Sequence, residues 1–126
     1  MTRAFPFVRN ADVDIRLYDF VARVRGGIQS KEELFDELAS KLNLPAYFGR
    51  NWEALDECLS ELDWLPGKRI AILHDGAPHL SRRELVIYLS ILDASWIALE
   101  DAGRLLTIGF PAQTQVLTDA WSGVKR

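Results

Sequence analysis

The sequence predicts an α/β fold, a small sandwich in which helices flank a short sheet. Apolar and amphipathic segments follow in the order strand, helix, helix, strand, helix, strand, and the helices would supply the crossovers that parallel strands need. The run at 70–73 is apolar throughout, which is typical of a strand buried on both faces. Two of the predicted helices begin with the S-x-x-E spacing of a capping box.

The bulk composition bounds the class of protein. With 126 residues, 48% of them hydrophobic and 26% charged, the chain is expected to form a single globular domain over 1–126. A net charge of −3 argues against direct nucleic-acid binding and permits a basic protein as partner. The sequence shows no signal peptide and no apolar run of membrane length, and one cysteine cannot form an internal disulfide. We expect a cytoplasmic protein with no membrane association, monomeric when free.

The first residues give the weakest signals. Residues 1–12 lack a clear period and are predicted to be irregular. Apolar residues alternate with polar ones over 13–17, which favours an extended segment. The stronger candidate for a core strand is 21–24, which a Gly-Gly pair terminates.

The first helix has clear start and stop signals. Ser30 and Glu33 have the capping-box spacing, in which each side chain satisfies a free backbone N–H of the other residue. The helix must end by Leu44, because Pro45 disfavours helical geometry at the residue before it.

The segment 44–64 organises the rest of the chain. Pro45 and Gly49 enclose two aromatic residues, which predicts a constrained turn, and Asn51 can cap a helix over about 51–63. Between Asn51 and Asp63 there are five acidic residues and no basic one, and Glu53, Asp56 and Glu57 lie opposite the apolar stripe. Because neighbouring like charges lower helix stability, this arrangement indicates a role other than stability. The apolar stripe comprises Trp52, Leu55, Cys58, Leu59 and Leu62.

The second half supplies two more strands and the longest helix. A polar loop at 74–79 follows the strand at 70–73, and Ser81 with Glu84 starts a helix over about 82–101. The last core strand is 105–108. The tail is expected to pack on the 87–98 side of the longest helix, because its apolar residues recur at helical spacing. These residues are Val116, Leu117 and Trp121.

No catalytic or metal-binding site is predicted. His74, Asp75 and His79 match no usual zinc spacing, so we interpret them as part of a polar surface loop. Cys58 lies on the apolar stripe and is interpreted as a buried residue rather than a nucleophile. Two glutamates, Glu53 and Glu57, could form an acid–base pair, but an outer helix face offers little of the concave, water-excluding site that catalysis needs. We expect no enzyme activity and no cofactor.

The segment 44–59 resembles the barstar family of ribonuclease inhibitors. The family pattern is Leu-Pro, an aromatic pair, Gly, any residue, Asn, and a helix with acid–x–x–x–acid before Cys-Leu. The matching residues are Leu44, Pro45, Tyr47, Phe48, Gly49, Asn51, Glu53, Glu57, Cys58 and Leu59. The order of elements matches over about 19–110, and the extensions 1–18 and 111–126 lie outside. The resemblance implies a three-layer sandwich with a short, mainly parallel three-stranded sheet flanked by helices.

The resemblance also implies a function, that of an intracellular inhibitor of a basic ribonuclease or related toxin nuclease. In the family, the acids at the positions of Glu53 and Glu57 enter the basic active site of the nuclease, and the second takes the place of a substrate phosphate. Tyr47 matches a contact residue of the family. The predicted partner-binding residues are Tyr47, Gly49, Asn51, Trp52, Glu53, Asp56 and Glu57.

The chain departs from the family at several of these positions. Both family aspartates are glutamates here, Asp56 replaces a tryptophan, and Trp52 replaces a leucine. Ala98 replaces a family glutamate that also touches the nuclease. These changes keep the acidic surface and alter its shape, which favours the same kind of partner rather than the same partner. Two alternatives stay open, a non-nuclease partner for this surface and a merely solvated charged face.

Overall fold

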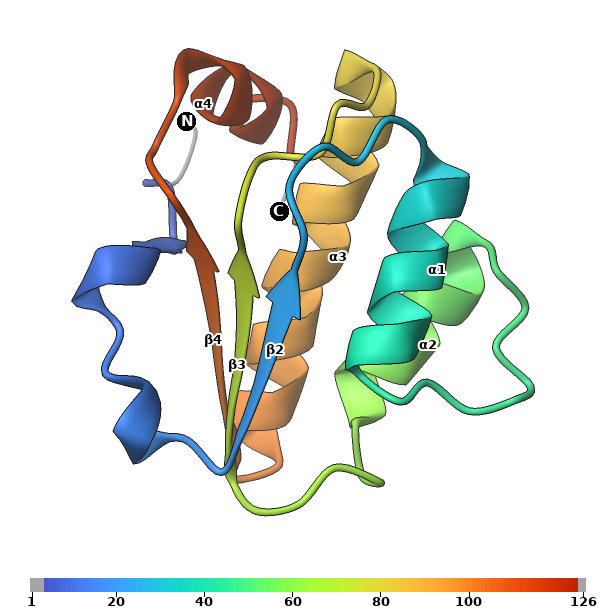
Figure 1. Ribbon diagram of the computed structural model, residues 1–126, viewed down its shortest axis with the longest axis vertical. Coiled ribbons are helices and arrows are strands. Elements are labelled where there is room, and N and C mark those ends of the chain that lie inside the picture. Colours follow the sequence, from blue (N-terminus) through green and yellow to red (C-terminus); the bar gives the residue numbers. More distant parts are fainter. Residues whose placement is uncertain (1–3, 125–126) are drawn as a thin grey trace.

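Four parallel strands form the central sheet, in the order β1-β4-β3-β2 (Figure 1). The structure is a computed structural model that describes residues 4–124. The strands are β1 (Val8–Arg9), β2 (Phe20–Val24), β3 (Arg69–His74) and β4 (Leu105–Phe110). The predicted α/β class, with a short parallel sheet flanked by helices, is confirmed. The sheet has one strand more than the three expected, because the two-residue strand β1 joins the edge of β4.

The central strand β3 is buried on both faces, as its apolar run predicts. Ile70 and Ile72 belong to the main core, and Ala71 and Leu73 on the opposite face are also fully buried. Strands β2 and β4 pair with β3 on either side over its length. Burial on both faces explains why β3 has no polar alternation.

The helices are α1 (Lys31–Lys41), α2 (Trp52–Glu61), α3 (Arg82–Asp101) and α4 (Gln115–Trp121). Helices α1, α2 and α3 lie in the crossover connections and run antiparallel to the strands, whereas α4 follows the last strand and lies across the end of the sheet (Figure 1). Helices α2 and α3 pack along each other, and α1 lies beside β2. The serines of both predicted capping boxes act as caps: Ser30 Oγ accepts from the N–H of Glu33 at 3.2 Å, and Ser81 Oγ accepts from the N–H of Glu84 at 3.1 Å. In place of the predicted reciprocal bonds, the Glu33 carboxylate accepts from Arg25 Nη2 and the Glu84 carboxylate from Ser81 Oγ.

The N-terminal segment is more ordered than its sequence predicts. Beyond β1 it contains two short 3-10 helices, Asn10–Asp12 and Ile15–Leu17. The extended segment predicted at 13–17 is therefore wrong. The cause is local, because Asp14 Oδ1 accepts from the N–H of Arg16 at 3.1 Å and caps the second 3-10 helix, which competes with an extended backbone.

The two ends of the chain meet in one aromatic cluster. Phe7 packs edge-on against Phe110 of β4 and against Trp121 of α4, with ring centroids 5.8 and 5.7 Å apart. Helix α4 packs on α3 as predicted, with Leu117 and Trp121 buried. It lies near the start of α3, since Arg82 Nη2 donates to the carbonyl of Asp119 at 3.3 Å. The contact with the 87–98 side expected from the sequence is therefore displaced toward the first turn of α3.

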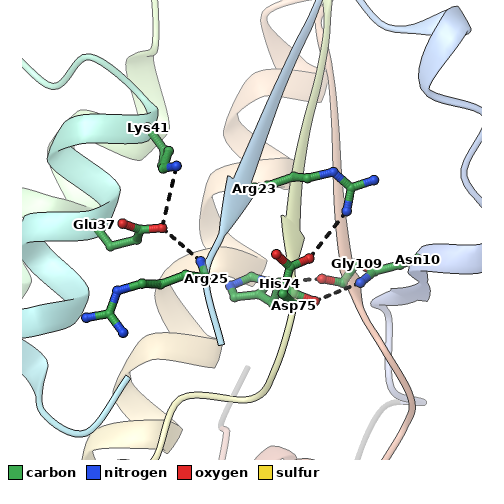
Figure 2. Close-up of polar contacts among 8 residues, drawn as sticks. All are labelled: Asn10, Arg23, Arg25, Glu37, Lys41, His74, Asp75 and Gly109. Carbon is green, nitrogen blue, oxygen red and sulfur yellow. Dashed lines mark hydrogen bonds and ion pairs between the residues drawn. The ribbon is translucent and has the colours of Figure 1, made fainter. Parts of the chain in front are cut away.

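His74 corrects the prediction of a polar surface loop at 74–79. It is the last residue of β3 and is completely buried. Its Nδ1 lies 2.9 Å from the carbonyl oxygen of Gly109, and its own carbonyl accepts from Asn10 Nδ2 at 2.7 Å (Figure 2). Its Nε2 lies 2.7 Å from the hydroxyl of Tyr88, and its ring stacks on Phe110 at 4.1 Å. His74 thus joins strands and helix as a core residue.

Arg104 fastens the connection that leaves α2. Its guanidinium donates to the carbonyls of Glu61, Leu65 and Gly67 at 2.9, 3.4 and 3.4 Å. The carbonyl of Glu61 belongs to the last turn of α2, where a cation also complements the helix dipole, and the other two carbonyls follow it.

Replacing Arg104 with methionine should therefore lower the free energy of unfolding by about 1–2 kcal/mol, because three acceptors lose a charged donor. Denaturant unfolding measures the change. Lys68→Met is the control, since Lys68 is exposed and its side chain forms no such bonds among the described residues. Equal midpoints for the two variants would contradict the role of Arg104.

Candidate partner-binding face

The loop before α2 presents one aromatic ring and buries the other. The N–H of Phe48 donates to the carbonyl of Pro45 at 2.9 Å, which closes the predicted turn. Phe48 is buried and packs edge-on against Phe35 of α1 at 5.9 Å. Tyr47 points outward and is 76% exposed. A large ring with a polar tip at such a position is a common interface anchor.

Contacts at both ends hold this loop against the body. Trp64 donates its indole N–H to the carbonyl of Leu42 at 2.8 Å. Arg50 adopts positive φ (54°) and forms an ion pair with Asp36 of α1. Because the guanidinium of Arg50 is paired with Asp36, it does not neutralise the carboxylates of α2.

Helix α2 begins as its sequence predicts and separates apolar from acidic residues. Asn51 Oδ1 accepts from the N–H of Ala54 at 2.8 Å, which confirms the cap. The helix ends at Glu61, two residues before the predicted end, because Leu62 adopts the left-handed conformation (φ 45°) and its N–H donates to the carbonyl of Cys58. Leu55, Cys58 and Leu59 are buried.

Five acidic side chains are exposed on and just after α2 and form what we call the acidic face: Glu53, Asp56, Glu57, Glu61 and Asp63. Within residues 4–124, none of their carboxylates forms an ion pair or a hydrogen bond. Unpaired carboxylates on a rigid helix are available to cations of a partner. Their mutual repulsion is a cost that binding would relieve.

A hollow of about 150 Å³ lies between the loop and the acidic face. Its lining residues are Tyr47, Phe48, Ala54, Glu57, Cys58 and Glu61. The pKa of Tyr47 is raised above its usual value, mainly by partial desolvation. The negative charges of nearby groups add to the effect, in the order Cys58, Glu61, Asp63 and Glu57. The hollow therefore brings an exposed phenol and two carboxylates one helical turn apart to the same place.

Cys58 lies in this hollow and should be unreactive in the native protein. It is 5% exposed, and burial, with a smaller contribution from Glu61 and Glu57, raises the pKa of its thiol. Because the thiolate is the nucleophile, both factors slow alkylation. A thiol reagent should label Cys58 slowly in native buffer and rapidly in denaturant. Rapid labelling of the native protein would contradict the burial of this side of α2.

The structure brings the predicted site residues into two adjoining groups. Tyr47 and Glu57 share the hollow described above, and Asn51, Trp52 and Glu53 line a second hollow at the start of α2. Gly49 and Asp56 are exposed but line neither hollow. Trp52 is half-buried against Phe35, with ring centroids 4.9 Å apart, so it serves the core as well.

Sequence reasoning did not include Glu61 among the candidate site residues. Glu61 lines the same hollow as Glu57 and Tyr47. The available signal was its spacing, four residues after Glu57 on the same helix face.

In residues 4–124 no group of three or more His, Cys, Asp and Glu side chains is arranged to hold a metal ion. None of the helices in that part of the chain combines the length and apolar character needed to span a bilayer.

A comparison with protein families agrees with this geometry. A family model described as Barstar (barnase inhibitor) matches residues 20–111. The matched region begins with β2 and includes α1, α2, β3, α3 and β4. The segments outside it are those whose aromatic residues meet around Trp121. No curated protein matches the sequence significantly.

Proposed function

The chain belongs to the barstar family, and from this premise we propose that it inhibits a basic ribonuclease or a related toxin nuclease by inserting the acidic face into the catalytic cleft. The observation that carries the proposal is the set of five exposed acidic side chains, unpaired among the described residues, on and just after a helix whose other side is fixed in the core. Inhibition of this kind requires no chemistry from the inhibitor, because occupancy of the cleft excludes the substrate.

Electrostatics would drive recognition in two ways. A single-signed face attracts an oppositely charged partner over long range and speeds encounter. Once docked, carboxylates that lie among the arginine and histidine side chains of a nuclease form charge-assisted hydrogen bonds. The net charge of −3 adds to the attraction.

Glu57 is the proposed substitute for a substrate phosphate. It lies at the centre of the α2 sequence and lines the hollow beside Tyr47. A cation of the partner that reached the carboxylate of Glu57 could also contact the ring face of Tyr47, a favourable arrangement for an arginine. Glu61 on the next turn would supply a second carboxylate to the same cation.

The differences from the family pattern favour a target other than barnase itself. The two glutamates at 53 and 57 reach one methylene further than the aspartates of the family pattern. Asp56 places a charge where that pattern has an indole. These changes suit a catalytic cleft that is positively charged, as in the family, but has a different depth.

Inhibition assays with purified enzymes test the proposal. The chain is titrated into a panel of basic microbial ribonucleases, barnase included, and residual RNA cleavage is measured. Stoichiometric inhibition of at least one enzyme by the wild type, lost in a Glu53→Gln/Glu57→Gln variant, is the expected result. Inhibition that survives this double substitution would remove the acidic face from the mechanism.

A further inference from the structure

A third hollow, which differs from the two described above and has the opposite electrostatic character, borders the acidic face. Helices α1, α2 and α3 all begin at the same end of the molecule (Figure 1). Between their first turns lies a hollow of about 400 Å³. Its lining residues are Lys31, Trp52, Ser81, Arg83, Glu84 and Ile87.

This hollow contains more donors than acceptors. Within the described part of the chain, the side chains of Lys31 and Arg83 form no ion pair or hydrogen bond, and the indole N–H of Trp52 has no acceptor. The one carboxylate among the lining residues is that of Glu84, and it accepts from Ser81 Oγ at 3.2 Å within the helix cap. Two free cations and a free indole N–H fit a ligand that carries an acceptor with negative charge.

Trp52 connects this hollow to the acidic face. The same residue lines a smaller hollow with Asn51 and Glu53. Its ring is held in place by Phe35 at 4.9 Å and by Tyr88 at 6.3 Å. A partner that covers Glu53 therefore reaches Trp52, which also lines the cationic hollow.

We propose that the hollow between Lys31 and Arg83 binds an acidic side chain, an Asp or Glu carboxylate, of the nuclease that the acidic face inhibits. The inference rests on the proposed function. It gives the interface two contacts of opposite sign, both next to Trp52. A face of a single sign defines the rotational orientation of the partner only weakly, and the second contact fixes it. The second contact also excludes nucleases that lack the acidic residue.

The proposal predicts an effect opposite to that of general electrostatics. Removing positive charge from an acidic inhibitor should speed its association with a basic partner wherever the charge lies. Only a direct contact makes the loss of Lys31 and Arg83 harmful. The variant is Lys31→Gln/Arg83→Gln, and the control is Lys41→Gln/Lys68→Gln, which removes the same charge from exposed positions outside the hollow.

Association and dissociation rates are measured with the nuclease that the wild type inhibits, and Glu57→Ala is measured alongside. We expect the Lys31/Arg83 variant to dissociate about 10-fold faster or more, and the control to dissociate like the wild type. Unfolding midpoints check that both variants fold.

Equal dissociation rates for the two double variants would overturn the inference, while loss of binding by Glu57→Ala would still support the proposed function. If Glu57→Ala binds like the wild type, or if the wild type inhibits no nuclease of the panel, the proposed function fails and the inference fails with it.

Discussion

Replacing Glu57 with alanine is expected to weaken the complex with the nuclease by about 2–5 kcal/mol, or roughly 30- to 5,000-fold, mainly through faster dissociation. The free-energy range is the one associated with removing one partner of a buried charge pair at protein interfaces, barnase–barstar among them. The cost is high because the cations of the nuclease stay buried and lose their counter-charge. Folding should be little affected, since Glu57 is exposed and alanine is the best helix former.

The control for Glu57 must carry the same charge and lie outside the hollow. Glu61 is unsuitable, because it shares the hollow with Glu57. Glu100, an exposed residue of α3, meets both requirements. Glu100→Ala should slow association slightly and leave dissociation unchanged. Equal effects of the two substitutions would reduce the acidic face to general attraction and remove the phosphate-like role of Glu57.

Acidification is expected to destabilise the protein through His74. A carbonyl only accepts, so the contact with Gly109 places the proton on Nδ1, and Nε2 accepts from the hydroxyl of Tyr88. Burial lowers the pKa of His74 from 6.5 to about 4, opposed by the bond to Gly109 and by the charge of Asp75. The buried imidazole is therefore neutral at pH 7.

The sign of the effect follows from proton uptake on unfolding. Between pH 6.5 and about 4 the unfolded chain binds a proton at His74 and the native chain does not, so stability that is present above pH 6.5 is lost as the pH falls to 4. The contribution amounts to about 3 kcal/mol. Denaturant unfolding is measured across this pH range for the wild type and for a His74→Phe/Tyr88→Phe variant, which has no titrating group at position 74. The free energy of unfolding of the wild type should fall by that much more than that of the variant. Parallel curves for the two proteins would contradict the assignment.

The elements that the sequence predicts well are those whose signals are local. The caps Ser30, Asn51 and Ser81 act within three residues of themselves, so their spacing alone locates the helix starts. The strand at 70–73 is recognisable because burial on both faces leaves an uninterrupted apolar run. The acidic face follows from helical periodicity for the same reason.

The features that sequence reasoning missed depend on partners far along the chain. His74 resembles the start of a loop because it is polar and follows an apolar run, yet Gly109 and Tyr88 satisfy both ring nitrogens inside the core. Strand β1 exists only because β4, about a hundred residues later, offers a free edge. The three acceptors of Arg104 likewise lie far along the chain from it, at the end of α2 and in the connection that follows. No local pattern indicates such contacts.

In the candidate site too, some features follow from the local sequence and others depend on the tertiary fold. Periodicity places Glu53 and Glu57 on one face of a helix, but the hollow at Glu57 requires the fold of the preceding loop, which turns Tyr47 outward and Phe48 inward. The cationic hollow requires three helices to begin at one end of the molecule, so that Lys31, Trp52 and Arg83 line the same hollow. Sequence spacing alone cannot bring these residues together.

Competition with a substrate analogue tests most directly whether the acidic face occupies a catalytic cleft. The nuclease is saturated with a non-cleavable oligonucleotide that fills its active site, and binding of the chain is then measured at constant ionic strength. We expect mutually exclusive binding, with the apparent Kd rising in proportion to the concentration of the oligonucleotide. A ternary complex of nuclease, oligonucleotide and inhibitor, formed with undiminished affinity, would contradict occupancy of the cleft.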